Sequence, residues 1–217
     1  MKRKIIIYIS VLGLFLTVLS GTISSQFQRS DSVSKKRQTT LSAEDTKLDK
    51  KDRLIISIAK EFAKEIKTKM KKWLSSNEIS EDKLFSYLYY PIADTNPKKF
   101  NTDYDKLSDR DIQNILEAYL IKDSDIIYTL LTDKNGYIPT HNKKYSQPLT
   151  GNRAKDLVNN RTKRIFADKT GLAAARNKKP YLIQLYKRDT GQILIDLSIP
   201  IYIGKRHWGA IRIGYLK

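Results

Sequence analysis

The basic residues that cluster in the second half of the chain are the first candidates for chemistry. Residues 153–188 hold 11 Lys or Arg and only two acidic residues. A guanidinium group can form two parallel hydrogen bonds with a carboxylate. We therefore expect Arg161, Arg164 and Arg176 to contact an anionic ligand such as an organic acid or an amino acid. The alternative is a solvated basic face, or arginines that bridge to loop carboxylates.

Aromatic and acidic side chains on neighbouring strand segments could complete such a site. An inward Asp196 could accept a hydrogen bond from an amine group of the ligand. Tyr137 and Tyr186 could each cover an apolar body and still offer a hydroxyl group. The chain has 13 tyrosines, so ordinary half-buried core is the alternative for both.

The two histidines, His141 and His207, are the other titratable candidates. His141 ends a predicted strand, where its ring could either bind near a cavity mouth or satisfy loop backbone groups. His207 and Trp208 open the last predicted strand, and the alternation of side chains places them on opposite faces. One of them can therefore face a cavity, while Trp208 could equally fill the core.

The composition argues against catalysis, metals and cofactors. The chain has no Cys and two His, which excludes disulfides, Cys-ligated metals and a Cys nucleophile. No nucleophile elbow, P-loop or dinucleotide-binding glycine motif is present. We therefore expect a protein that is not an enzyme and has no cofactor.

The positive charge is large but spread along the chain. The formal net charge of +18 includes +3 from residues 1–25, +7 from residues 26–75 and +8 from the remainder. A nucleic-acid module concentrates its charge on one face more often, so we expect no nucleic-acid partner. A surface that binds polyanions or acidic lipid stays as an alternative.

The N-terminus has the pattern of an export signal. Three basic residues at 2–4 precede an uncharged apolar run at 5–23, which is close to the ~20 residues that span a bilayer. The flanking charge predicts a cytoplasmic N-terminus and a single-pass inner-membrane anchor, with residues 26–217 in the periplasm. The alternative is a cleaved leader and a secreted periplasmic protein.

A linker and a long helix follow residues 1–25. Residues 26–50 are rich in Ser, Thr, Lys and Asp, which is typical of a linker. Apolar residues then recur every three or four positions and predict an amphipathic helix over 51–75. Its stripe requires a partner, either its own domain or the same helix of a second chain, which would form a homodimer through 51–74.

The rest of the chain predicts short helices and then a sheet. We expect a helix at 80–88 capped by Ser80, and another that starts near Ser108. Strands are predicted at 125–133, 137–141, 181–188, 192–203 and 207–216, with a short helix at 157–166 and a bend or bulge at Pro200. The order predicts an α+β domain over 51–217, with a five-stranded antiparallel sheet at 125–217 and helices on one face. The helical excursion before the third strand would cover a small cavity.

Several strings of the sequence resemble one known family in order and spacing. They are PIADTNP (91–97), DKNGYIPTHN (133–142), NRTKRIFADKT (160–170), YKRDTG (186–191), DLSIPI (196–201) and KRHWGAIRIGY (205–215). Together they resemble the extracytoplasmic PAS-like, or single Cache, sensor region of bacterial methyl-accepting chemotaxis receptors. The resemblance covers roughly residues 80–217.

The resemblance implies a small-molecule sensor that passes a conformational signal across a membrane. It covers the input domain only, because no second transmembrane helix, HAMP linker or signalling coiled coil follows within the 217 residues. Three arrangements are then open: a free-standing anchored sensor module, a partner of a separate signalling receptor, and a fragment of a truncated receptor. The alternative is an accessory or scaffold protein of a receptor complex that binds no ligand of its own.

Overall fold

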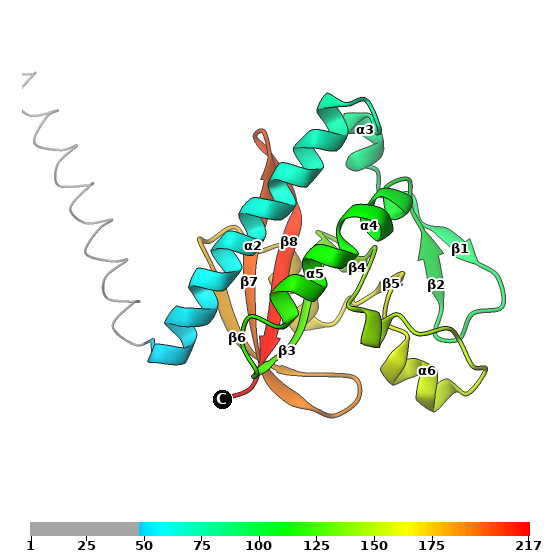
Figure 1. The fold of residues 1–217 in the computed structure, drawn as a ribbon. Helices are drawn as coiled ribbons and strands as arrows, with labels where there is room; N and C mark the ends of the chain where they lie inside the picture. The colour runs from blue at the N-terminus through cyan, green and yellow to red at the C-terminus, as the bar shows by residue number, and fades with distance from the viewer. Residues whose placement is uncertain (1–47) are drawn as a thin grey trace, which may run out of the picture. The chain divides into compact units, whose positions relative to one another are not determined.

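The computed structural model describes residues 48–217. They form an α+β domain around a four-stranded antiparallel sheet with the strand order β3-β8-β7-β6 (Figure 1). Within this described part, no helix is long and apolar enough to cross a membrane. The predicted span at 5–23 and the predicted linker up to residue 47 lie outside the described residues. The strands of the sheet are β3 (Ile126–Asp133), β6 (Leu182–Lys187), β7 (Ile193–Ile203) and β8 (Arg206–Tyr215).

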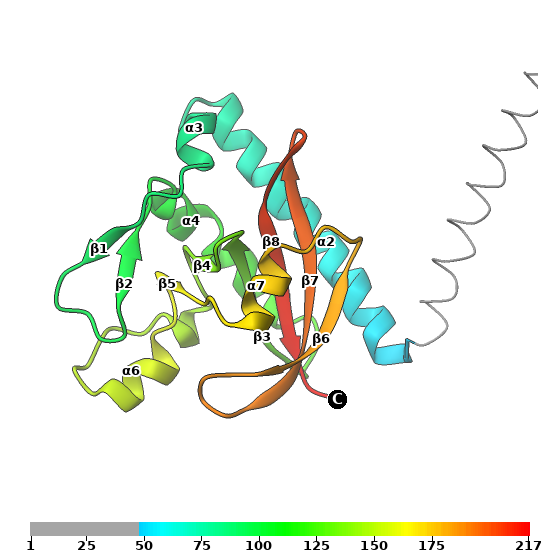
Figure 2. The ribbon, with the colours of Figure 1, turned by 180° about the vertical axis from the view of Figure 1, so that it is seen from behind.

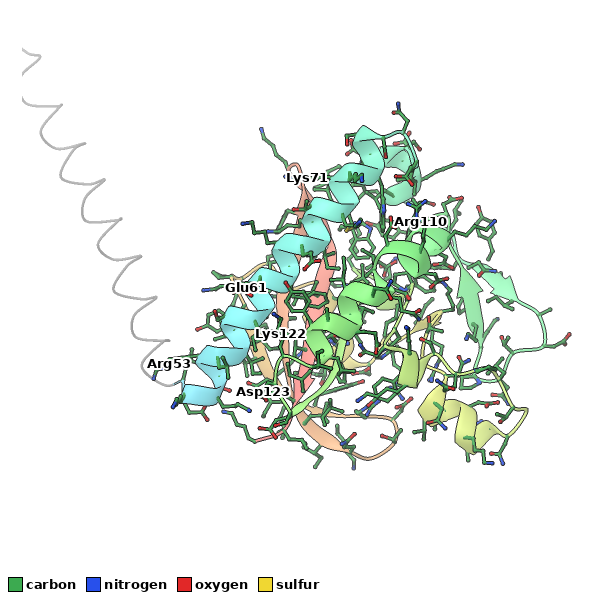
Figure 3. The ribbon with its side chains drawn as sticks, in the orientation of Figure 1. Arg53, Glu61, Lys71, Arg110, Lys122 and Asp123 are labelled. Atoms are coloured by element: carbon green, nitrogen blue, oxygen red, sulfur yellow. The ribbon has the colours of Figure 1, made fainter. Side chains whose placement is uncertain are left out.

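The long helix α2 (Lys50–Ser75) confirms the prediction for 51–75 almost to the residue. The Asp49 carboxylate caps it by accepting a hydrogen bond from the Asp52 amide at 2.8 Å. The apolar stripe of α2 packs on β7 and β8 of its own sheet, and α5 (Gln113–Leu120) lies beside it on the same face. Arg53, Glu61 and Lys71 point away from the sheet (Figure 3). The homodimer through 51–74 stays a prediction.

The structure differs from the prediction that helices cover only one face of the sheet. Helix α7 (Lys169–Ala175) contacts β6, β7 and β8 from the side opposite to α2 (Figure 2). The reason is that β8 is buried at every position from Trp208 to Tyr215, without alternation. A strand that is apolar on both sides requires a cover on each.

The sheet also has four strands where five were predicted. The second predicted strand, β4 (Tyr137–Ile138), pairs with β5 (Arg164–Ile165) and has no ladder with β3; the chain after β4 forms one isolated bridge to β3, from His141 to Leu130. The turn at Gly136 sends the chain that way. Gly136 has a φ of +87°, and a Cβ there would lie 2.3 Å from the Phe166 carbonyl oxygen, so only glycine allows this close approach.

The segment between β4 and β6 corrects a second prediction. The helix expected at 157–166 is replaced by α6 (Arg153–Asn159) followed by β5. Asn152 explains the earlier start, because its side-chain oxygen accepts hydrogen bonds from the Ala154 and Lys155 amides. A 3-10 turn, η1 (Lys143–Tyr145), precedes α6.

The remaining short elements lie between α2 and β3. Helix α3 (Glu81–Leu84) has the predicted cap, since Ser80 accepts a hydrogen bond from the Lys83 amide, but it ends at Leu84 and does not continue to the predicted residue 88. Strands β1 (Tyr90–Ile92) and β2 (Lys99–Asn101) form a separate hairpin. Helix α4 (Asp105–Asp111) begins before Ser108, because Asp105 accepts from the amide and the hydroxyl of Thr102 and so closes the first turn earlier.

The prediction of a bulge near Pro200 is confirmed. The register of β7 on β8 shifts between Ile201 and Tyr202. Strand β6 begins with Leu182 opposite Ser198 and does not reach Pro200, so β7 has a neighbouring strand on only one side there. A proline is tolerated there because no second ladder needs its missing amide hydrogen.

Hydrogen bonds and ion pairs join the last residues of β8 to the start of α2. The Tyr215 hydroxyl donates to Asp52 Oδ1 at 2.5 Å. Lys217 Nζ lies 2.7 Å from Asp52 Oδ2 and 2.9 Å from Asp49 Oδ2. The end of the sheet and the start of the long helix are therefore fixed to each other.

Candidate functional site

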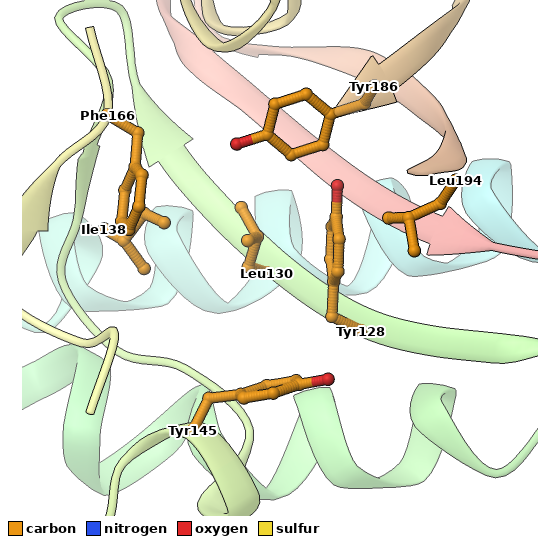
Figure 4. Close-up of a cluster of buried hydrophobic side chains, with 7 residues drawn as sticks. All are labelled: Tyr128, Leu130, Ile138, Tyr145, Phe166, Tyr186 and Leu194. Carbon is orange, nitrogen blue, oxygen red and sulfur yellow. The ribbon is translucent and has the colours of Figure 1, made fainter. Parts of the chain in front are cut away.

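A small pocket, with a free interior of about 10 Å³ that is room for about one water molecule, lies between the α7 face of the sheet and the segment from β4 to β5. Its apolar side belongs to a cluster of buried side chains gathered around Leu130 (Figure 4). Its polar side carries three arginines and one histidine. The lining residues are Tyr128, Leu130, Ile138, His141, Arg161, Phe166, Tyr186, Arg188 and Arg212.

Strand β8 places Arg212 in this pocket. Its neighbours Ile211 and Ile213 are fully buried, and alternation puts their side chains on the other face of the strand, toward α2. Tyr215 has the parity of the isoleucines and contacts Asp52 of α2, which fixes the assignment of the two faces. Arg212 therefore stands on the α7 face.

Arg212 and Asp196 form a buried ion pair beneath the pocket. The Arg212 Nε atom donates to Asp196 Oδ1 at 3.0 Å, and both side chains are almost fully buried. The Tyr128 hydroxyl donates to the same carboxylate oxygen at 2.6 Å. Burial is the largest single influence on the pKa of Arg212 and lowers it, but the charge and hydrogen bond of Asp196, together with Tyr128 and Tyr186, outweigh burial and raise that pKa. The Arg212 guanidinium therefore stays charged in spite of its burial.

Arg161 and Arg164 share a second carboxylate at the pocket's edge. Arg161 Nη1 lies 2.7 Å from Asp189 Oδ1, and Arg164 Nη2 lies 3.2 Å from Asp189 Oδ2. Burial opposes ionisation of Asp189, yet the charges and hydrogen bonds of the two arginines lower its pKa. The Asp189 carboxylate therefore stays ionised, and its two oxygens are paired with Arg161 and Arg164.

Two guanidinium nitrogens at the pocket have no hydrogen-bond partner among the described residues. They are the Nη2 atoms of Arg188 and Arg212, and both are buried. The other terminal nitrogen of Arg188 donates to the Gln192 side chain at 2.8 Å. A buried charged donor without an acceptor is costly, so each unpaired nitrogen needs an explanation.

Aromatic rings hold these guanidinium groups in place. Arg212 Cζ lies 5.1 Å from the centroid of the Tyr186 ring. Arg188 Cζ lies 5.0 Å from the centroid of the Tyr145 ring. Arg161 and Arg164 stack in the same way on Phe166. Such cation–π contacts restrict the arginines without using their hydrogen-bond donors.

The charges around the pocket do not balance. Four arginines surround it, and the two carboxylates in contact with them are Asp189 and Asp196. The surplus is two positive charges. An anion that accepted hydrogen bonds from Arg188 and Arg212 would reduce this surplus and satisfy both unpaired nitrogens.

His141 lines the same pocket as a neutral ring. Its Nδ1 atom accepts a hydrogen bond from the Asn142 amide at 2.8 Å, so the ring proton is on Nε2. Burial lowers the pKa of His141 well below its usual value, and the nearby charges of Arg161, Arg188 and Arg212 lower it further. Neutral His141 therefore adds a donor to the pocket without adding charge.

The neutral state of His141 predicts a pH dependence of folding. The unfolded ring takes up a proton near pH 6.5 and the folded ring resists it, so stability is present above that value and is lost as pH falls below it. The loss approaches about 1.4 kcal/mol per pH unit, measured by urea unfolding between pH 7.5 and 5.5. His141→Gln should remove most of this slope. The control His207→Gln should keep most of it, because that ring is only partly buried. Equal slopes in both variants would contradict the assignment.

The structure brings together some of the residues expected from the sequence. His141, Arg161 and Tyr186 line the pocket. Arg164 and Asp196 lie immediately behind it, through Phe166 and Arg212 respectively. Asp196 was expected to accept from an amine group of a ligand, but in the structure its oxygens already accept from Tyr128, Gln184 and Arg212.

Four expected residues lie outside this pocket. The Tyr137 hydroxyl donates to the Asp105 carboxylate. Trp208 is buried in the core, and its indole nitrogen donates to the Leu84 carbonyl at 2.9 Å. Arg176 is exposed and donates to the Lys134 carbonyl at 3.0 Å. His207 borders a different groove, near α3.

Sequence reasoning missed two arginines of the pocket, Arg188 and Arg212. A signal existed for Arg212, because it is the only charged residue in the run from Trp208 to Leu216. A charge in a strand buried on both faces requires a partner or a ligand. Arg188 carried no such signal, because it lies beside a turn.

No family model matches the chain, and no curated protein matches it either.

Proposed function

We propose that this chain is an extracytoplasmic sensor for a small carboxylate-bearing anion, attached to a membrane through residues 5–23 and acting by conformational change. The observation that carries the proposal is the pair of buried, unpaired guanidinium nitrogens on Arg188 and Arg212. They line the same pocket and face a surplus of positive charge. A carboxylate has two oxygens and can accept from both arginines.

The pocket also limits the rest of the ligand. Its free interior of about 10 Å³ has room for about one water molecule, so a carboxylate has to widen the pocket when it binds. Leu130, Ile138 and Phe166 form an apolar wall, which favours a small apolar body next to the carboxylate. Asp189 and Asp196 already hold arginines, so neither has a role left for a ligand ammonium group. We therefore propose a simple carboxylate in preference to an amino acid.

A path for the signal follows strand β8. Arg212 contacts the pocket, and three residues later Tyr215 hydrogen-bonds Asp52 at the start of α2. A ligand that accepts a hydrogen bond from Arg212 would favour one position of β8 relative to α2. Helix α2 directly follows the proposed anchor and linker, so its start is a suitable place to transmit the change to a separate receptor.

Removal of one unpaired arginine is the direct test. The full chain is purified in neutral detergent, and its melting temperature is measured with propionate, pyruvate, benzoate and alanine. At least one carboxylate should raise the melting temperature through preferential binding to the folded state, whereas alanine should not. Arg188→Gln should abolish this shift and should cost about 1 kcal/mol or less in stability, because the charge it removes has no carboxylate partner.

The matched control is Arg176→Gln, which removes an exposed arginine outside the pocket. It should keep the carboxylate-dependent shift. If none of the carboxylates stabilises the well-folded chain, the proposal fails. The role of accessory protein in a receptor complex then becomes the better account.

A further inference from the structure

A second group of cations lies in an open groove of about 320 Å³ near the C-terminal end of α2. The groove is bordered by α3, by the turn after β3 and by the hairpin that joins β7 to β8. It shares no lining residue with the pocket around Arg212. Its lining residues are Phe85, Tyr87, Lys134, Lys178, Arg206 and His207.

The positive charge in this groove is only partly balanced. Arg206 Nη1 lies 2.9 Å from Glu81 Oε1, in an ion pair whose two side chains are about half exposed. Within residues 48–217, neither Lys134 nor Lys178 has a carboxylate oxygen within ion-pair distance. Three cations and one carboxylate leave two positive charges, which a dianion would match.

Two of these cations are held over aromatic rings. Lys134 Nζ lies 4.4 Å from the centroid of the Tyr87 ring, and Arg206 Cζ lies 3.9 Å from that of Phe85. The Arg176 side chain donates to the backbone carbonyl of Lys134. Ordered cations lose less entropy when they bind an anion than free surface lysines do.

His207 supplies a hydrogen-bonding group that selects among anions. Its Nε2 atom is buried and has no partner in the described part of the chain. Its ring stacks against Tyr202, with the ring centroids 4.9 Å apart. Hydrogen phosphate carries both a donor hydroxyl and acceptor oxygens, so it can pair with Nε2 whether that atom is protonated or not.

We propose that this groove binds a phosphate group, either free or as a phosphate monoester, between Lys134, Lys178 and His207. The site is independent of the carboxylate pocket, and neither proposal requires the other. The same phosphate chemistry occurs in soluble metabolites and in the headgroup of phosphatidic acid, so the test has one arm for each source.

The two histidines of the chain make the test direct, because their ring signals can be separated by NMR with a His207→Gln spectrum for assignment. The full chain in neutral detergent is titrated with inorganic phosphate and with sulfate. We expect a saturable shift of the His207 signals with phosphate, a weaker response to sulfate, and no movement of the His141 signals. Lys134→Gln/Lys178→Gln should weaken the phosphate response at least tenfold.

The matched control is Lys71→Gln/Lys72→Gln, which removes two exposed lysines of α2 that do not line the groove. It should leave the response unchanged, and so should Arg188→Gln. In the second arm, the chain is reconstituted in phosphatidylcholine vesicles with and without phosphatidic acid. A response to free phosphate assigns a soluble ligand, and a response only to phosphatidic acid assigns a membrane headgroup. No saturable response in either arm, or equal weakening in both double variants, would overturn the proposal.

Discussion

Arg212→Met is expected to destabilise the domain by about 3–5 kcal/mol, because it breaks a buried ion pair. The reason is that Asp196 is fully buried and would lose the cation that neutralises it. Urea unfolding of the full chain measures this loss. The same variant should also lose all response to carboxylates, because one of the two unpaired guanidinium nitrogens is gone.

The double variant Arg212→Met/Asp196→Asn separates the two effects. It removes the buried charge but keeps an acceptor for the Tyr128 hydroxyl, so more than half of the lost stability should return. Carboxylate binding should stay absent. Additive costs of the two single substitutions would show that the pair is not coupled and would contradict the interpretation.

Gly209→Ala is expected to cost about 3 kcal/mol, for a reason unrelated to charge. A Cβ at Gly209 would lie 2.0 Å from the Thr132 carbonyl oxygen and 2.7 Å from Asp133 Cα. Both atoms belong to the backbone of β3, so the two strands would have to separate at the turn end of the sheet. Thermal or urea unfolding would measure the loss.

Gly191→Ala provides the contrast. Gly191 has a φ of +88° but no atom within 4 Å of an added Cβ, so only backbone strain opposes the change. That strain is about 1 kcal/mol. If Gly191→Ala proved as costly as Gly209→Ala, the close approach of β3 and β8 would not be the cause.

The sequence was most informative where one physical pattern dominated the segment. The 3.6-residue period of 51–75 predicted α2 because the whole apolar stripe packs against the chain's own sheet. The strands β3, β6, β7 and β8 were predicted in order, and the bulge near Pro200 followed from its missing amide hydrogen. These features depend on local residue types, which a sequence displays.

The errors concern pairings between distant segments. The return strand after Gly136 was assigned to the main sheet, whereas the close approach of Phe166 directs it to β5. The arginine-rich excursion was expected to supply the ligand contacts. Arg161 and Arg164 do lie there, but both are occupied by Asp189, 28 and 25 residues away. Which arginine keeps a free nitrogen depends on such partners, and no local pattern reveals them.

The contact of Lys217 with Asp49 and Asp52 has a consequence for the connectivity of the domain. The entrance to α2 and the exit from β8 are neighbours, so a short peptide could join them without disturbing the sheet. A new opening could then be made at the exposed turn around Gly191, which would give a circular permutant with the same core. By the same geometry, residues 49–217 could be inserted into a surface loop of another protein, since the two ends are close enough for the Lys217 side chain to reach Asp49.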